Sequence, residues 1–522
     1  MNRKEQIEKL SSTSAENWDM IIIGGGATGL GIALDASSRG YKTLLLEQSD
    51  FAKGTSSKST KLVHGGVRYL AKGDIGLVME ALKERGLLLK NAPHIAGNQE
   101  FIVPVYTWWD ALKYTVGLTL YDLLAGKLSL GKSKFIYKKT VVNRLPLIRT
   151  EGLKGGIVYH DGQFDDARLA IDLAKSAIDH GATVLNYFKV TGLKKDQQGT
   201  INGVEAIDID SDIKYSLLSG IVINATGVFA DEIHHLDEPS SKPTFRPSQG
   251  VHIVLDNTFL NGSSALMIPE TDDGRVLFAI PWHNKVVVGT TDTPVESVVL
   301  EPVAISSEID FILQTAGRYL TKQPVKNDIL SVFAGLRPLA VNNSNPTSTK
   351  EISRRHKITI SDSGLISIVG GKWTTYRRMA QDVLNIAIKS KKIPEKPCIT
   401  ENLSIYRPTQ KPLKDNRLML YGEYACEIES ITETHPSMKE LIHPKFLYTN
   451  AEIVFIARHE MPHDIEDVLA RRTRALFLDA DASFEAAKTV ASIMATELGL
   501  GVEWQKKQLE SYHELLKYYS IH

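Results

Sequence analysis

A run of glycines near the start of the chain has the composition and spacing of a phosphate-binding turn. Residues 24–29 read Gly-Gly-Gly-Ala-Thr-Gly, which fits the pattern GxGxxG, and an acid stands after the next apolar run. Glycines permit a tight turn and let the backbone approach a pyrophosphate, while the acid accepts hydrogen bonds from ribose hydroxyls. The pattern indicates dinucleotide binding, through these candidates: Gly24, Gly26, Ala27, Thr28, Gly29 and Glu47.

Three elements must surround this turn if it is to bind a ligand. The apolar run 20–23 predicts a strand buried on both faces, residues 30–38 predict a helix that stops at Gly40, and residues 43–46 predict a second strand. The helix N-terminus would direct its free amides at the anion. Glu47 disfavours the 2′-phosphate of NADP but does not separate FAD from NAD, and a glycine-rich turn without a ligand is the alternative.

The segment 54–70 is first rich in hydroxyl groups, then glycine-rich, then basic. The groups that could contact a pyrophosphate come first: Thr55, Ser56 and Lys61. Gly65 and Gly66 would let the backbone approach a flat ring, which would bring the polar side chains of His64, Arg68 and Tyr69 near that ring. From composition alone, an ordinary polar loop is the alternative.

This segment resembles the signature of FAD-dependent glycerol-3-phosphate dehydrogenases, the bacterial aerobic enzymes and their mitochondrial relatives, within the flavoprotein class that resembles D-amino-acid oxidase. The similarity runs from about Asp19 to beyond Leu500, through residues 165–169, 224–227, 289–292, 335–339, 370–377 and 471–479. The resemblance implies FAD as cofactor, oxidation of sn-glycerol 3-phosphate to dihydroxyacetone phosphate by hydride transfer to it, and reoxidation by a quinone. Three alternatives stay open: oxygen as the acceptor, a 2-hydroxy acid or amine as the substrate, and a flavin-binding protein with a degenerate site.

A phosphorylated substrate requires an anion-binding site, and arginine binds two phosphate oxygens at once. By match to the family, Arg337 and Arg354 form this clamp, although a register slip of one residue would exchange Arg354 for Arg355. Arg68 and Tyr69 are expected to position the substrate. A solvated surface arginine is the alternative at each clamp position.

Candidates for the flavin side and for proton transfer complete the site. Residues 366–369 predict a strand, followed by a Gly-Gly-Lys turn and a helix N-terminus that would stabilise negative charge on the reduced flavin. The cofactor contacts expected here are Gly371, Lys372, Thr374 and Thr375, with Ala225, Thr226 and Gly227 crossing the nucleotide half. His64 is the candidate general base, because its ordinary pKa of about 6.5 suits proton removal near neutral pH. Arg337 and Lys372 are counted with His64 as catalytic.

With 522 residues, the chain exceeds the roughly 250–300 residues of a single core. The expected fold is mixed α/β and α+β: a Rossmann-like FAD-binding domain with an inserted antiparallel-sheet substrate domain, and a C-terminal helical domain. Residues 1–17 are expected as a polar tail, and 18–395 as the oxidoreductase region. Within that region, FAD-binding segments at about 18–240 and 345–395 flank a substrate roof at about 241–344. Residues 396–522 are expected to form the helical domain, in which the role of Arg471, Arg472 and Arg474 is open.

Composition indicates where the protein acts in the cell and which classes of partner are excluded. Lys+Arg and Asp+Glu both number 61, a balance that argues against a dedicated nucleic-acid binder. Two cysteines without ligand spacing predict neither a zinc site nor a disulfide framework. The aromatic-rich segment 101–125 predicts either an interfacial membrane segment or a buried helix. A protein on the cytoplasmic, inner face of the plasma membrane is expected, with a homodimer as a further possibility.

Overall fold

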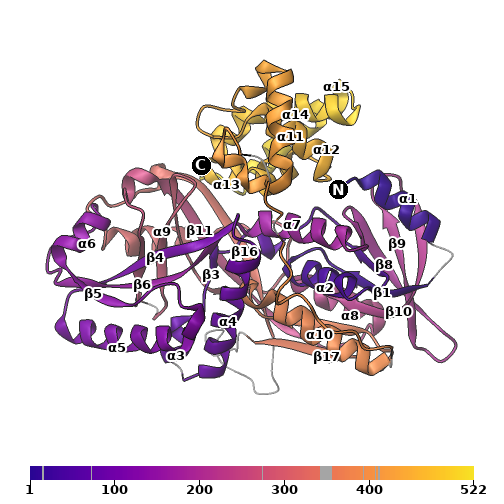
Figure 1. Cartoon of the computed structure of the whole chain (residues 1–522), viewed down its shortest axis with the longest axis horizontal. Coiled ribbons are helices and arrows are strands. Elements are labelled where there is room, and N and C mark those ends of the chain that lie inside the picture. The colour runs from indigo at the N-terminus through magenta and orange to yellow at the C-terminus, as the bar shows by residue number, and fades with distance from the viewer. Residues whose placement is uncertain are drawn as a thin grey trace.

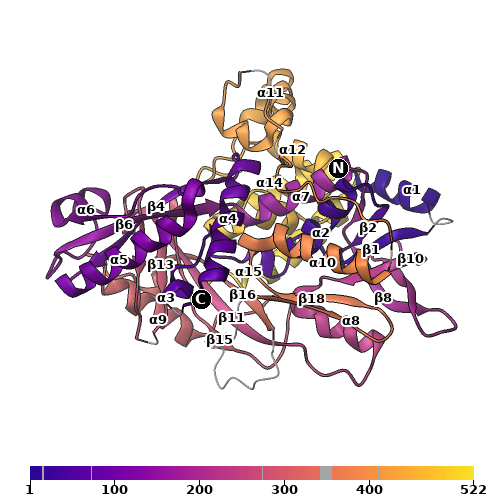
Figure 2. The same ribbon diagram turned by 60° about the horizontal axis from the view of Figure 1, so that its bottom comes forward.

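The computed structural model describes residues 1–13, 17–71, 73–272, 274–340, 355–391, 393–405, 407–409 and 412–521. The described chain forms two sheets side by side, with a helical domain above both (Figure 1). In the turned view the part of the helical domain around α11 projects from the molecule (Figure 2). This arrangement confirms the mixed α/β and α+β fold with a C-terminal helical domain.

The first sheet is Rossmann-like. Its central strands pair in parallel in the order β18-β10-β1-β2-β7, while β17 joins β18 and β9 joins β10 in antiparallel pairs. The strands of this sheet are β1 (Trp18–Ile23), β2 (Thr43–Leu46), β7 (Thr183–Leu185), β8 (Phe188–Lys195), β9 (Ile201–Asp208), β10 (Lys214–Asn224), β17 (His356–Ile360) and β18 (Ile366–Gly370). The strands predicted at 20–23 and 43–46 are therefore confirmed.

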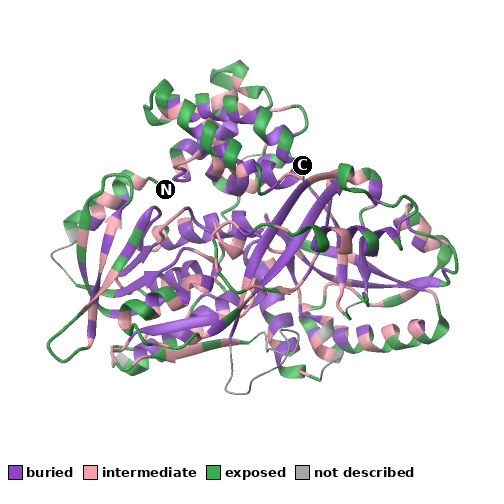
Figure 3. Cartoon of the chain, turned by 180° about the vertical axis from the view of Figure 1, so that it is seen from behind, coloured by how far each residue is buried: buried purple, intermediate pink, exposed green. Residues whose placement is uncertain are grey.

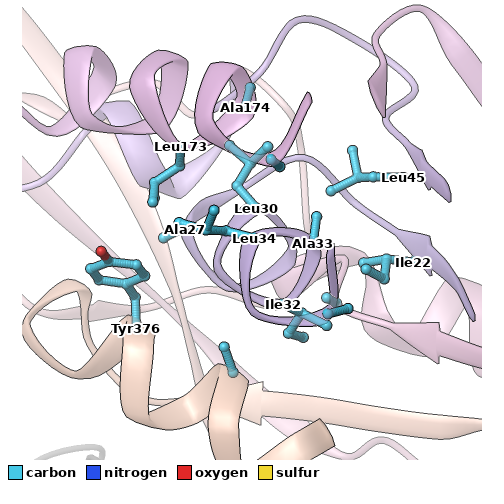
Figure 4. Packing of buried hydrophobic residues seen from close by; sticks show 14 of the residues in the cluster. Ile22, Ala27, Leu30, Ile32, Ala33, Leu34, Leu45, Leu173, Ala174 and Tyr376 are labelled. Atoms are coloured by element: carbon cyan, nitrogen blue, oxygen red, sulfur yellow. The ribbon is translucent and has the colours of Figure 1, made fainter. Parts of the chain in front are cut away.

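Both faces of this sheet are covered, which explains why β1 and β2 are continuously apolar. Alternate side chains point to opposite faces: Met20 and Ile22 pack under helices, whereas Ile21 and Ile23 pack against β8 and β9. The helices on the first face are α2 (Ala27–Ser38), α7 (Asp166–Asp179) and α10 (Tyr376–Lys391). Figure 4 shows α2 between its neighbours, with these side chains labelled: Ile22, Ala27, Leu30, Ile32, Ala33, Leu34, Leu45, Leu173, Ala174 and Tyr376.

The second sheet is mostly antiparallel, lies beside the first, and contains the strands expected for the substrate roof. Its order is β15-β11-β14-β13-β12-β4-β6-β3, with β16 paired to β11 and β5 paired to β6. Its strands are β3 (Leu62–Val63), β4 (Ala96–Val105), β5 (Lys134–Tyr137), β6 (Gly155–Phe164), β11 (Phe245–Asp256), β12 (Ala265–Ile268), β13 (Leu277–Trp282), β14 (Lys285–Gly289), β15 (Thr293–Pro294) and β16 (Ile329–Ala340). The helices beside it are α3 (Val67–Ala71), α4 (Ile75–Asn91), α5 (Trp108–Ala125), α6 (Lys138–Arg144) and α9 (Ser306–Gly317).

Two expected boundaries need correction. The roof is not confined to 241–344, because β12 pairs with β4 and so adds strands from residues 62–164 to the sheet. Residues 1–17 are not simply a polar tail, because Arg3–Thr13 form helix α1. The side chain of Leu10 in α1 is fully buried against the first sheet, and Gln6 accepts a hydrogen bond from the Val184 amide. A short helix with few apolar residues gives only a weak helical pattern in the sequence, and its stability depends on this packing.

The helical domain begins after an irregular connector. Its longer elements are α11 (Ala425–Thr434), α12 (Asn450–His459), α14 (Ala480–Leu498) and α15 (Val502–Leu516). The predicted capping box is confirmed, because Thr449 and Glu452 each bond the other's backbone amide at the start of α12. The core of the domain continues into the second sheet through Val254, Trp282, Val287 and Phe333. Figure 3 shows long buried strands through the middle of the molecule and exposed residues on the outside of this domain.

Candidate functional site

A cavity of 770 Å³ is lined by residues from both sheets and the loops between them. Its volume falls in the range of small-molecule and cofactor sites. Most of the candidate residues line it: Gly24, Gly26, Ala27, Thr28, Glu47, Thr55, Ser56, His64, Gly66, Tyr69, Ala225, Thr226, Gly227, Arg337, Gly371, Lys372 and Thr374. The fold thus brings together segments that are far apart in the sequence.

One end of the cavity has the geometry of a pyrophosphate cradle. Gly24 has a φ of 109°, and a Cβ there would lie 2.7 Å from the Ala225 carbonyl oxygen. A Cβ on Gly29 would lie 1.9 Å from the Gly24 carbonyl oxygen, so Gly29 closes the turn from below rather than lining the cavity. Helix α2 starts at this turn, and Gly26 contributes no capping side chain. The cradle therefore fits the phosphates of the expected FAD.

Glu47 follows the last residue of β2 and lines the cavity, as expected for a ribose-binding acid. Its carboxylate accepts the Gly25 amide at 2.6 Å and the Ser49 amide at 2.8 Å. Burial raises the pKa of Glu47, and the two amides counteract this rise. These bonds fix the carboxylate beside the glycine turn while leaving lone pairs for hydroxyl donors.

Two candidates in the segment 54–70 lie outside the cavity lining. Lys61 does not reach the pyrophosphate cradle, because its ammonium is fully buried and donates to Asp166 and to the Ser57 carbonyl, both at 2.7 Å. Gly65 is set back from the lining, and its amide donates to the Tyr121 hydroxyl at 2.7 Å. A Cβ on Gly65 would lie 2.5 Å from that hydroxyl, so the glycine is needed for helix packing rather than for ring contact.

Another part of the cavity lining lies at the end of β18, beside the loop that follows β3. Gly370 and Gly371 both have a φ of 84°, and they turn the chain into a short 3₁₀ segment before α10. The Lys372 ammonium lies 3.9 Å from the centre of the Tyr69 ring. Thr375 supports this turn by donating to the Lys372 carbonyl and is itself outside the lining.

His64 is fixed beside this turn. Its backbone amide donates to Thr374 Oγ1 at 3.1 Å, which ties the histidine loop to the start of α10. Burial lowers the pKa of His64 to about 4; nearby Asp161 opposes this shift and Lys372 adds to it. The imidazole is therefore neutral near pH 7, with a free nitrogen lone pair but a lower proton affinity than the ordinary pKa of about 6.5 would give.

Arg337 lines the cavity from β16, and its guanidinium is held by oxygen atoms of four residues, one of which is the carboxylate of Asp292 at 3.5 Å. It donates to the carbonyls of Gln249 and Thr291 at 3.3 and 3.1 Å, and to Thr290 Oγ1 at 3.0 Å. Gly250 on the paired strand provides the space, since a Cβ there would lie 2.0 Å from a guanidinium nitrogen. A guanidinium held in this way is suited to bind an anion.

The second clamp residue, Arg354, lies outside the described residues, as does the side chain of Arg68. The neighbouring Arg355 is described, and its guanidinium binds Asp74 at 2.8 Å.

His252 is a cavity residue that the sequence interpretation did not single out. It lies on β11 two residues after Gly250, a spacing that places both on one face of the strand. Its Nε2 and Thr60 Oγ1 share a hydrogen bond of 2.9 Å, and its ring stacks on Phe333 at 4.9 Å. Burial holds the pKa of His252 well below its usual value, so the ring is neutral. In the sequence, only its position two residues after a glycine on an apolar strand indicated that His252 could line the cavity.

Comparisons with known proteins agree with this geometry. A family model described as FAD dependent oxidoreductase matches residues 19–377, and one described as the C-terminal domain of alpha-glycerophosphate oxidase matches residues 364–508. A probable mitochondrial glycerol-3-phosphate dehydrogenase from Caenorhabditis elegans is 38% identical over 97% of this chain and 74% of its own length. The mitochondrial glycerol-3-phosphate dehydrogenase of Homo sapiens is 37% identical over 99% of this chain and 75% of its own length.

Solved structures show the same fold. The glycerol-3-phosphate dehydrogenase from Bacillus halodurans, complexed with FAD, has a TM-score of 0.79 at 28% identity and covers 99% of this chain and 98% of its own. The L-alpha-glycerophosphate oxidase from Mycoplasma pneumoniae, with FAD bound, has a TM-score of 0.57 at 17% identity over 71% and 95% of the two chains. FAD is thus the cofactor: the family depends on it, and the glycine turn and the cavity fit it.

Proposed function

Because this chain belongs to the family of FAD-dependent glycerol-3-phosphate dehydrogenases, we propose that it oxidises sn-glycerol 3-phosphate to dihydroxyacetone phosphate and passes the electrons to a quinone. The observation that carries the proposal is the position of Arg337. Its guanidinium lies in the wall of the cavity that also contains the glycine cradle, His64 and Lys372. One cavity thus holds both a dinucleotide site and an anion site.

The cavity residues have distinct roles in this reaction. When bound, FAD supplies a flavin that accepts the hydride. Arg337 binds the phosphate, and Lys372 adds a second positive charge to the cavity lining. His64 removes the hydroxyl proton, which its neutral imidazole allows. The amides at the start of α10 stabilise negative charge in the adjoining cavity. Arg354 and Arg68 belong to the same proposal by their match to the family.

Anaerobic titration with glycerol 3-phosphate tests the substrate and the cofactor together. The purified protein should be yellow, and the substrate should bleach the flavin absorbance stoichiometrically. L-Lactate and glycine should leave it unchanged, because they lack the phosphate that Arg337 binds. Bleaching by either of these and not by glycerol 3-phosphate would exclude the proposal in favour of a 2-hydroxy acid or amine substrate.

The same sample then distinguishes the acceptors. Adding a soluble quinone to the bleached protein should restore the colour within the time of one turnover, whereas air-saturated buffer should restore it more slowly. Faster recovery with oxygen than with quinone would identify an oxidase.

The exposed face of α5 supports a membrane location for the quinone reaction. Within the described residues, no helix combines the length and the apolar character needed to cross a bilayer. Helix α5 buries Leu118 and Tyr121 against the roof, while Trp109 and Leu123 are 74% and 72% exposed. Its other exposed apolar side chains are Trp108, Leu112, Val116 and Leu120. This outer face fits the apolar boundary of a lipid leaflet, and we place the protein at the inner face of the plasma membrane.

Replacing Trp109 and Leu123 by glutamine is expected to lower binding to anionic phospholipid vesicles by about 100-fold or more, because burying each large apolar side chain contributes roughly 1.5–3 kcal/mol. Cosedimentation measures the effect. The matched control replaces Leu447 and Val502 by glutamine; these residues belong to the helical domain and are 63% and 76% exposed. Flavin reduction in solution should be unchanged in both variants. Equal loss of vesicle binding in the control would refute a specific role for α5.

A further inference from the structure

The cofactor loop, residues 47–61, connects β2 to β3 and has little regular structure of its own. Only Thr55–Ser57 form a short 3₁₀ turn. Yet this loop supplies much of the cavity wall: Glu47, Gln48, Ala52, Lys53, Gly54, Thr55, Ser56, Lys58, Ser59 and Thr60. Contacts with other parts of the chain therefore fix its conformation; Thr55 donates to the Leu336 carbonyl and Lys58 binds Glu301 on the roof side, and further contacts come from the helical domain.

The first of these contacts is at Asp50. Its carboxylate is fully buried and accepts hydrogen bonds at 2.5–2.9 Å from Arg471 Nε and from both terminal nitrogens of Arg472. Arg472 also donates to the carbonyls of Glu460 and Asp467. Two guanidinium groups of the helical domain thus hold one carboxylate of the loop, in a setting where removing a partner leaves a buried charge uncompensated.

The second contact is at Ser57. Its carbonyl accepts from Arg474 Nη2 at 2.9 Å and from the Lys61 ammonium at 2.7 Å, and both cations also bind the Asp166 carboxylate. Arg474 has a φ of 62°, a backbone conformation that residues other than glycine rarely adopt. From this position the Arg474 side chain reaches the Ser57 carbonyl of the loop.

A third contact joins the same short stretch of the helical domain to the loop. The Lys53 ammonium donates to Glu466 at 2.8 Å. Residues 466–474 therefore hold the loop at three points, next to residues that line the cavity.

The domain interface has another buried ion pair that avoids the loop altogether. Arg168 of α7 binds Glu460 and Asp172, and Arg168 and Glu460 are each 3% exposed. Attachment of the domain therefore does not by itself require the contacts to the loop.

We propose that the C-terminal helical domain is a clamp on the cofactor loop, in which Arg472 and Arg474 are positioning residues that set the affinity for FAD without touching it. Residues that orient the ligands of a metal change metal affinity by roughly 10- to 100-fold when removed, and we expect an effect of the same order here.

The test compares Arg472→Met and Arg474→Met with the matched control Arg168→Met. FAD is removed from each protein, and its dissociation constant is measured by flavin fluorescence well below the melting temperature. The two clamp variants should bind FAD roughly 10- to 100-fold more weakly, whereas the control should stay within about twofold of the parent even if its melting temperature falls. Arg472→Lys should give an intermediate value, because an ammonium cannot reproduce the two-pronged bond to Asp50.

Hydrogen exchange of the protein without FAD gives a second readout. The amides of residues 50–61 should exchange faster in the clamp variants and at the parent rate in the control. Unchanged FAD affinity and unchanged exchange in the clamp variants would overturn the proposal and leave only a stabilising role. If Arg472→Met does not fold, Arg472→Lys decides the matter, and a dissociation constant equal to that of the parent would overturn the proposal.

Discussion

Replacing Arg337 by methionine is expected to lower kcat/KM for glycerol 3-phosphate by roughly 10²- to 10⁴-fold. The guanidinium can offer two hydrogen bonds to a charged phosphate, and each such bond contributes about 1.5–3 kcal/mol. Arg337 is held by Gln249, Thr290 and Thr291, so it is already oriented before the substrate arrives. Steady-state kinetics with a soluble quinone measures the loss, and Arg337→Lys should retain part of the activity.

Gly250→Ala provides a separate control for the position of this guanidinium. The added Cβ would lie 2.0 Å from an Arg337 nitrogen, so the side chain must move while its charge remains. Activity should fall in this variant, and the flavin content should stay the same, because Gly250 lies on the roof, away from the phosphate cradle. If Gly250→Ala and Arg337→Met both kept the activity of the parent, Arg337 would not be the residue that binds the anion.

The cofactor end of the site could be predicted because its requirements are local. Gly24, Gly29 and Glu47 lie within one βαβ unit, where the backbone angles and close contacts follow directly from the order of residues. The same holds for Gly370 and Gly371, whose positive φ angles are a requirement of one turn. Local geometry of this kind is visible in a sequence without knowledge of the fold.

The misplaced residues are those whose partners are distant in sequence. Lys61 has the chemistry of a phosphate ligand, but its partner is Asp166 and its ammonium is buried below the loop. Gly65 has the appearance of a ring-contact glycine, but it makes room for Tyr121 of α5. In both cases the residue type indicates what the residue can do, a cation that binds oxygen or a glycine that leaves space. Packing between distant segments decides which neighbour it contacts.

The same limit applies to the roof and to the C-terminal arginines. The pairing of β12 with β4 joins segments far apart in the chain, and no alternation within 241–344 indicates it. Arg471, Arg472 and Arg474 resemble solvated surface charges in sequence, yet all three are buried. Arginines in the core require buried acids, and Asp50 and Asp166 belong to elements that precede them by hundreds of residues.

Replacing His64 by alanine is expected to lower the rate of flavin reduction at saturating glycerol 3-phosphate by roughly 10²- to 10⁴-fold, the usual contribution of a positioned general base. Anaerobic stopped-flow mixing measures this rate in a single turnover, so it is independent of the acceptor. His234→Gln is the control, because that histidine is also partly buried and has a lowered pKa but lies outside the cavity lining. A rate in the His64 variant equal to that of the parent would exclude His64 as the base.

The pH dependence gives the same residue a second test. Burial lowers the pKa of His64 to about 4 from an ordinary value of about 6.5. A base must be unprotonated. The reduction rate of the parent should therefore be nearly constant above about pH 5, where His64 is neutral, and should fall as the pH approaches 4. The unfolded chain binds more protons at this site between about pH 4 and 6.5, so the contribution of His64 to stability declines as the pH falls through that window. The His64→Ala protein should lose both dependences, because neither can persist without the imidazole that titrates.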